Sequence, residues 1–111
     1  MAKKRPMTPT ERAHVRRVKQ LGCLICKRAA EAHHITTGSG MGGRATHFET
    51  IPLCFDHHQA QTPLPFGEAV HKGTETFERK YGTQLEMLER TRNLLLRVFP
   101  QYNPLNGEKN Q

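Results

Sequence analysis

The chain has few of the residues that build a large apolar core. Of its 111 residues, 35% are hydrophobic and 6% aromatic, and there is no tryptophan. A domain of this length removes only about two-thirds of its unfolded surface from water. The composition therefore excludes an extensive core. It favours a bound metal as an added source of stability, which for structural zinc is on the order of 10 kcal/mol.

Long hydrophobic runs are also missing. No stretch approaches the ~20 apolar residues of a membrane span, and the N-terminus lacks the apolar segment of a secretory signal. We therefore expect a protein of the cytoplasm with no membrane partner. Cysteine is scarce, and three cysteines cannot all pair in disulfides. In a reducing compartment the spacing of Cys23 and Cys26 is typical of metal or redox chemistry.

Positive charge is abundant, and it is concentrated at one end. The formal charge is +7, yet residues 1–28 hold nine Lys or Arg against Glu11 alone, so the rest of the chain is close to neutral. Such asymmetry favours a polyanion partner, of which nucleic acid is the commonest. The alternative is a solvated tail that only increases solubility.

The basic N-terminal quarter divides into an arm and a helix. Residues 1–7 show no hydrophobic period and are expected to form a flexible basic arm. The motif Thr8-Pro9-Thr10-Glu11 is a capping box with proline at the first helical position, and it predicts a helix that runs to about Leu21 and stops at Gly22. One basic ridge on this helix would present the DNA-binding candidates Arg12, Arg16 and Arg17.

The middle of the chain predicts two short strands followed by a helix. "AEAHHIT" and "FETIPLC" are brief, partly apolar stretches separated by a glycine-rich loop, Thr37 to His47. In this loop Arg44 either reaches a phosphate or belongs to a merely flexible hairpin connection. The helix that begins at "FDHHQAQ" is limited to about two turns by Pro63 and Pro65.

Two more helices are expected before the C-terminus. Thr74 would cap the first, which ends at about Tyr81 before Gly82. A second capping box, Thr83 to Glu86, begins a helix that runs up to Pro100. Its apolar positions at helical spacing are Leu85, Leu88, Leu95 and Phe99. We expect residues 8–100 to form one domain and residues 101–111 a flexible tail.

The cysteines and one histidine have the spacing of a structural zinc site. Zinc prefers four tetrahedral thiolate or imidazole ligands, usually supplied as two closely spaced pairs. Cys23 and Cys26 form one pair, and Cys54 and His57 form the other, with 27 residues between the pairs. Two alternatives stay open, in which the cysteines are reduced core residues or Cys23 and Cys26 are a thioredoxin-like redox pair.

Two histidine doublets lie beside these cysteines. If His57 binds zinc, His58 points elsewhere, because successive helical residues diverge by roughly 100° around the axis. His33 and His34 lie on a predicted strand, where neighbouring side chains leave opposite faces. A single histidine is usually a surface or core residue, but two doublets near a zinc site favour a functional role.

Together these motifs resemble the HNH, or ββα-metal, endonuclease superfamily. The matching features are the cysteine pair, "AHHI" on a strand, a loop, and "LCFDHH" leading into a helix. The stretch from "HHITTGSGMGG" to "FERKYG" further resembles the recombination-enhancement (Ref-like) nucleases of temperate phages. The resemblance covers about residues 21–85. It implies an α+β fold with a small zinc-stabilised, treble-clef-like ββα-metal core and flanking helices.

The resemblance also implies roles for individual residues. His33 and His58 would bind a catalytic Mg²⁺ or Mn²⁺, and His34 would be the general base that activates water. All three imidazoles would surround one site. The middle asparagine of the family motif is missing, so His47 and Glu49 are the candidates for the residue that orients His34 or for a third ligand. His71 either approaches the site or is a plain surface residue.

The function implied is weakly sequence-specific, metal-dependent DNA hydrolysis in phage recombination, inside a bacterial host and in dependence on the RecA filament. Two rival functions share some of these residues. A non-catalytic zinc module that binds nucleic acid would use the cysteine site and the basic arm but would not need His33, His34 and His58. A thiol oxidoreductase would use Cys23 and Cys26 and would hold no zinc.

Overall fold

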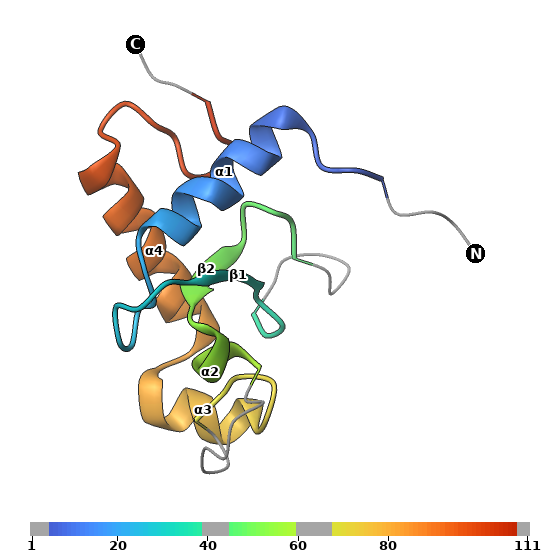
Figure 1. Cartoon of the computed structure of the whole chain (residues 1–111), viewed down its shortest axis with the longest axis vertical. Helices are drawn as coiled ribbons and strands as arrows, with labels where there is room; N and C mark the ends of the chain where they lie inside the picture. The colour runs from blue at the N-terminus through green and yellow to red at the C-terminus, as the bar shows by residue number, and fades with distance from the viewer. Residues whose placement is uncertain (1–4, 39–44, 60–67, 109–111) are drawn as a thin grey trace.

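Helices surround one short antiparallel strand pair (Figure 1). The computed structural model describes residues 5–38, 45–59 and 68–108. The elements in chain order are α1 (Pro9–Gln20), β1 (Glu31–His34), β2 (Thr50–Leu53), α2 (Phe55–His58), α3 (Thr74–Tyr81) and α4 (Gln84–Val98). This arrangement confirms the predicted α+β class. None of the described helices is long and apolar enough to cross a membrane.

The strand pair lies at the centre of the described chain. In its register His33 is opposite Ile51 and His34 is opposite Thr50. Every residue of β2 is buried, and β2 packs against both α1 and α4. On β1 the side chain of His33 is buried and that of His34 is exposed. The expected separation of the two histidines onto opposite faces is therefore confirmed.

The first helix begins and ends where its sequence predicts. The Thr8 hydroxyl accepts a hydrogen bond from the Glu11 backbone N–H, and the Glu11 carboxylate accepts one from the Thr8 N–H, so the capping box is complete. Gly22, just after the helix, has φ +80°, a conformation that favours glycine. The buried face of α1 packs against the strands and α4.

Helix α2 is shorter than predicted. Its described extent is one turn, Phe55–His58, with Gln59 as the C-cap, while residues 60–67 lie outside the described chain. The end of α2 is joined to a later segment by two backbone hydrogen bonds. The Val70 N–H donates to the His57 carbonyl at 2.9 Å, and the His71 N–H donates to the His58 carbonyl at 3.1 Å.

The last two helices confirm most of their predicted bounds. Helix α3 starts at Thr74, although Gly73 rather than Thr74 is its N-cap, and the capping box of α4 at Thr83 is formed. The predicted apolar stripe is wrong at its first position, because Leu85 is 48% exposed. Leu85 instead lies over Gly38, whose φ is +73° and whose missing Cβ would be only 2.5 Å from Leu85 Cγ.

Both chain ends are more structured than predicted within the described residues. Tyr102 is buried and contacts α1, and the backbone turns through residues 103–108. The expected flexible tail is therefore wrong for residues 101–108, and residues 109–111 lie outside the described chain. In the expected arm, Arg5 forms an ion pair with Glu11 at 3.1 Å. Residues 1–4 are not described.

Candidate metal centres

Three cysteines and one histidine meet at the junction of the strand pair with α2. Cys23 and Cys26 lie in a tight turn after α1, which is closed by a hydrogen bond from the Lys27 N–H to the Cys23 carbonyl. Lys27 has φ +68°, and this left-handed residue turns the chain back after Cys26. The Cys23 N–H then donates to the Arg28 carbonyl. Cys54 is the N-cap residue of α2, and His57 follows one turn later. The sequence pairs predicted as ligands are thus brought together.

The geometry of this cysteine site suits a tetrahedral metal ion. One ligand atom from each residue lies within 4.8 Å of the other three. The Sγ atoms of Cys26 and Cys54 are 3.6 Å apart, and Nδ1 of His57 is 3.2 Å from Cys54 Sγ and 3.8 Å from Cys23 Sγ. Adjacent ligand atoms around tetrahedral zinc are about 3.5–3.8 Å apart, given Zn–S near 2.3 Å and Zn–N near 2.0–2.1 Å. The four residues can therefore hold a metal ion.

A nearby arginine balances the charge of the sulfurs. Arg28 Nε donates to Cys26 Sγ at 3.4 Å, Arg28 Nη2 lies 3.9 Å from Cys54 Sγ, and the same Nη2 is 3.4 Å from the Asp56 carboxylate. Burial disfavours the Cys26 thiolate, but the hydrogen bonds from Arg28, together with those from Cys54 and Cys23, outweigh it and lower the pKa of Cys26 to about 6. Burial raises the pKa of the Cys54 thiol. Three thiolates around a divalent ion would carry a net charge of −1, which the guanidinium, itself paired with Asp56, would partly offset.

A second cluster consists of three histidines from three different elements. His33 comes from β1, His58 from α2, and His71 from the segment before α3. One nitrogen of each ring lies within 4.8 Å of those of the other two. The ring centroids are 4.8 to 5.0 Å apart. The backbone hydrogen bond between His71 and His58 explains how a residue outside both doublets joins the site.

Each ring of the histidine cluster is held by a neighbour. His33 Nε2 is 2.9 Å from Gln84 Oε1, and His58 Nδ1 is 2.8 Å from Glu31 Oε1. Nε2 of His71 lies 3.1 Å from Nε2 of His58. Two imidazoles bound to one divalent ion at about 2.1 Å would have their nitrogens about 3.0–3.4 Å apart, so the separation suits a shared ion.

The environment keeps His33 neutral. Burial is the main cause, and neighbouring histidine charges add to it, so the pKa of His33 falls to about 4 even though the hydrogen bond to Gln84 raises it. A neutral imidazole is the form that binds a metal. His33 is therefore in its ligand form at neutral pH.

His34 is not part of this cluster. Its Nε2 is 2.8 Å from Nδ1 of His47, and the two rings lie 4.9 Å apart on the exposed side of β1. The expected grouping of His33, His34 and His58 is therefore wrong for His34 as a member of the cluster, because strand alternation directs His34 to the other face of β1 and His71 is the third member. The general-base role expected for His34 stays a prediction. Glu49 is not a member of the histidine cluster either, and its carboxylate accepts a hydrogen bond from the Thr46 N–H.

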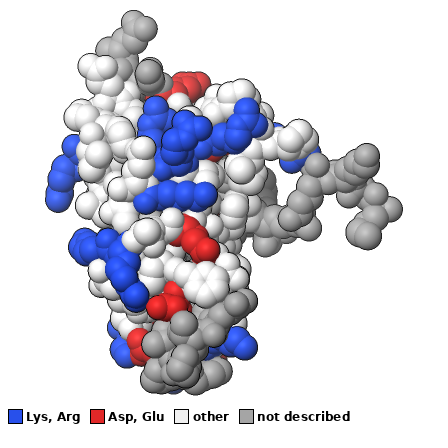
Figure 2. Space-filling view, in the orientation of Figure 1, with Lys and Arg blue, Asp and Glu red and all other residues white. Residues whose placement is uncertain are grey.

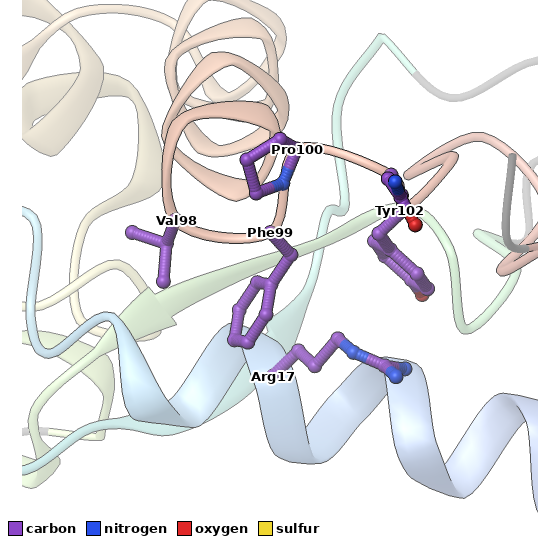
Figure 3. Close-up of a pocket in the computed structure, with 6 residues that line it drawn as sticks. Arg17, Val98, Phe99, Pro100 and Tyr102 are labelled. Carbon is purple, nitrogen blue, oxygen red and sulfur yellow. The ribbon is translucent and has the colours of Figure 1, made fainter. Parts of the chain in front are cut away.

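The predicted DNA-binding arginines have different surroundings. Lys and Arg side chains gather over α1 on the face shown in Figure 2. Arg12 and Arg16 are exposed, and Arg12 Nη1 also donates to the Met7 carbonyl at 2.6 Å. Arg17 instead lines a 520 Å³ pocket, where its guanidinium carbon lies 4.2 Å from the Tyr102 ring centre and 5.6 Å from that of Phe99 (Figure 3). Arg44 lies outside the described residues.

Two polar residues of the histidine cluster were not found by sequence reasoning. Glu31 precedes His33 by two positions on the same strand face, so an acidic residue at that spacing was an available signal. Gln84 is 51 residues from His33, is fully buried and begins α4. No local pattern connects it to the site.

The fold and the two clusters define a small α+β protein with a cysteine–histidine group able to bind metal. By comparison of sequences, the chain belongs to the family described as "Protein of unknown function (DUF968)", which it matches over residues 1–98. It is 35% identical over 80 residues to the uncharacterized protein YdfU of Escherichia coli (strain K12). The matched part is 69% of this chain and 20% of YdfU, so the chain spans about a fifth of that relative's length. No solved structure matches the chain.

Proposed function

We propose that the protein is a metal-dependent DNA endonuclease of the HNH, or ββα-metal, type. The observation that carries the proposal is the convergence of His33, His58 and His71 beside a cysteine site, on a unit of two antiparallel strands followed by a helix. A module that only bound nucleic acid would have no use for a second cluster of three imidazoles.

The two clusters would hold different ions. Three thiolates and an imidazole favour Zn²⁺ in a structural role, with all four positions filled by protein. Three imidazoles leave positions open for water and a phosphate oxygen. Mg²⁺ or Mn²⁺ was the expected working metal, and of the two Mn²⁺ accepts imidazole ligands better, while Zn²⁺ and Ni²⁺ also suit this donor set. When bound, the ion supplies electrostatic stabilisation of the charge that develops on the phosphate and on the departing 3′ oxygen.

The protein residues would position and activate the nucleophile. A water oxygen attacks the phosphorus, His34 takes up a proton from that water, and the bond from phosphorus to the 3′ oxygen breaks. Because His34 and the histidine cluster lie on opposite faces of β1, the scissile phosphate would have to lie at the end of this strand, beside its last residue His34. The departing oxygen takes a proton from solvent water, so the products carry 5′-phosphate and 3′-hydroxyl ends. The contact between His47 and His34 supports an orienting role for His47, which is one of the two residues considered for that place.

Substrate binding would be largely electrostatic. The exposed arginines of α1 and the basic residues before it would contact phosphates, which fixes position without reading sequence. We therefore propose weakly sequence-specific cutting. The roles in phage recombination, dependence on the RecA filament and action in the bacterial cytoplasm are parts of the proposal that rest on the resemblance to Ref-like nucleases.

The test is an incubation of purified protein with labelled single-stranded and duplex DNA, with Mg²⁺ or Mn²⁺ and with EDTA, each with and without RecA. We expect metal-dependent products with 5′-phosphate ends, lost in His34→Ala while DNA binding persists. Glu89→Gln is the matched control, because Glu89 is an exposed residue of α4 and belongs to neither cluster among the described residues.

Binding without cutting under every metal condition would favour the rival, a zinc module that binds nucleic acid. A protein that holds no zinc and shows titratable Cys23 and Cys26 thiols would favour the thiol oxidoreductase. Cleavage at equal rates with and without RecA would contradict the proposed dependence on the RecA filament and would still support nuclease activity.

A further inference from the structure

Gln84 stands out among the buried polar residues because it connects a distant helix to the histidine cluster. It is fully buried at the first position of α4, and its side chain reaches β1 and the residues that follow it. Its backbone N–H donates to the Glu78 carboxylate at 2.8 Å, which also accepts a hydrogen bond from the Thr37 hydroxyl at 2.7 Å. The side chain therefore approaches His33 from a fixed backbone.

The contacts of Gln84 identify which of its side-chain atoms faces His33. The Thr36 backbone N–H can only donate, and it lies 2.8 Å from Gln84 Oε1. The other amide atom, Nε2, donates to the Thr36 hydroxyl at 2.9 Å. The oxygen of the amide is thus held toward the N–H, and this same oxygen is 2.9 Å from His33 Nε2.

An oxygen acceptor at that place determines the tautomer of the imidazole. A neutral histidine carries its proton on one nitrogen and a lone pair on the other. Because Gln84 Oε1 can only accept, His33 must donate from Nε2, and the lone pair is left on Nδ1. Glu31 acts in the same sense on His58, since its carboxylate accepts from Nδ1 and leaves the lone pair on Nε2, the atom that faces His71.

We propose that Gln84 is a positioning residue, which holds His33 as the Nε2–H tautomer so that Nδ1 is presented to a divalent metal in the histidine cluster. This inference rests on the metal-binding part of the proposed function and not on DNA cleavage. Partners that orient a metal-bound histidine typically change metal affinity about 10- to 100-fold when they are removed.

Three variants separate positioning from support of the fold. Gln84→Met keeps the shape but removes all three hydrogen bonds of the side-chain amide, and Gln84→Glu keeps an acceptor toward His33. The matched control is Thr91→Val in the same helix, because Thr91 is also buried and loses one hydrogen bond, from its hydroxyl to the Met87 carbonyl.

The first measurement is the tautomer of His33 in protein whose histidine cluster holds no metal. It is determined from long-range ¹H–¹⁵N correlation spectra of protein labelled at the histidine nitrogens. The second is Co²⁺ affinity of protein loaded with one equivalent of Zn²⁺, followed by visible absorption. Sulfur-to-cobalt bands in the near ultraviolet report any exchange at the cysteine site, and His33→Ala defines the absorption that belongs to the histidine cluster.

We expect an Nε2–H tautomer in the wild type, in Gln84→Glu and in Thr91→Val. In Gln84→Met we expect a tautomer mixture and a loss of Co²⁺ affinity of about 10- to 100-fold. Wild-type spectra and affinity in Gln84→Met would overturn the inference, as would failure of the wild-type cluster to bind Co²⁺. A wild type that binds Co²⁺ as expected but cuts no DNA would refute the nuclease and leave the role of Gln84 intact.

Discussion

The cysteine site and the histidine cluster lie one peptide bond apart on α2, yet they are built differently. The cysteine site has four candidate ligands, which come from two pairs with two residues between partners and would fill all four positions of a tetrahedral ion with protein atoms. The histidine cluster has three candidate ligands from three elements, and each ring contacts a neighbour that orients it. Closed sets of ligands are typical of metals that hold a fold together, and incomplete sets are typical of metals that bind substrate.

The largest expected effect is on the fold itself and comes from Cys23→Ser. Cys23 is fully buried, so the change removes a proposed zinc ligand and leaves a buried hydroxyl in its place. We expect loss of bound zinc, together with unfolding or a fall in unfolding free energy of several kcal/mol. Calorimetry and metal analysis of the purified variant provide the measurement.

EDTA treatment of the wild type is the control, since chelation should reproduce the effect of the substitution. A variant that keeps both its zinc content and its melting temperature would show that the cysteine site does not stabilise the fold.

The second prediction is that His58→Ala, unlike Cys23→Ser, impairs activity and leaves stability nearly unchanged. The variant should keep its zinc and melt within a few degrees of the wild type. It should lose Co²⁺ binding at the histidine cluster, and cleavage should fall on the order of 100-fold or more. Equal destabilisation by His58→Ala and Cys23→Ser would mean that both clusters are structural and would remove the contrast between them.

A third prediction concerns His14, a buried histidine that belongs to neither cluster. It is hydrogen-bonded to Tyr102, and burial, followed by the charges of Arg17 and Arg92, lowers its pKa to about 4 from a usual value of 6.5. Because the unfolded chain takes up this proton first, stability is fully present above pH 6.5 and is lost as the pH falls toward 4. The contribution is at most on the order of 3 kcal/mol.

Urea unfolding of holoprotein between about pH 7 and pH 5 measures this loss. Protonation of the metal ligands is common to wild type and His14→Gln, so the difference between their pH profiles isolates His14. We expect a flatter profile in the variant. Parallel profiles would assign the acid sensitivity to the metal sites alone.

Glu31→Gln should have a moderate effect that is confined to the histidine cluster. An amide can still accept a hydrogen bond from His58 but loses the negative charge, so Co²⁺ affinity should fall about tenfold, at the lower end of the range for such partners. Titration of the zinc-loaded protein gives the value. Asp56, which is paired with Arg28 beside the cysteine site, offers the matched comparison, because Asp56→Asn should leave this affinity unchanged.

The smallest expected effect is on DNA binding by the exposed face of α1. Arg16→Ala should lower the slope of log affinity against log salt by about 0.9, as expected for one lost phosphate contact, with no change in melting temperature. Arg17→Ala should also lower stability, because the guanidinium packs over Tyr102 and Phe99. Fluorescence anisotropy at several salt concentrations, with thermal melts, distinguishes the two.

Short-range rules predicted the elements of the fold well. The two capping boxes, the glycine that follows α1 and the alternation of His33 and His34 depend on residues within a few positions of one another, and the structure confirms each of them. The spacing of the cysteine pairs likewise predicted a group that the structure brings together. Local chemistry is sufficient when both partners lie in one turn or one strand.

The parts that sequence reasoning missed depend on contacts between distant segments. His71 joins the histidine cluster through a backbone hydrogen bond to His58. Gln84 contacts His33 from the start of α4. Tyr102, which was expected in a flexible tail, is hydrogen-bonded to His14. Leu85 was placed in the core because of its helical spacing, but the helix begins only one residue earlier and that position faces outward over Gly38.

The shortness of α2 bears on how metal ions would fill the two proposed sites. A free helix of four residues, none of them buried, does not persist in water, because a single turn does not repay the entropy of fixing its backbone. Helix α2 packs against β1 and β2, and its end is hydrogen-bonded to Val70 and His71. In the proposed function, an ion at the cysteine site would fix His57 as well, and with it the backbone of the next residue, His58. Filling of the cysteine site would therefore strengthen metal binding at the histidine cluster.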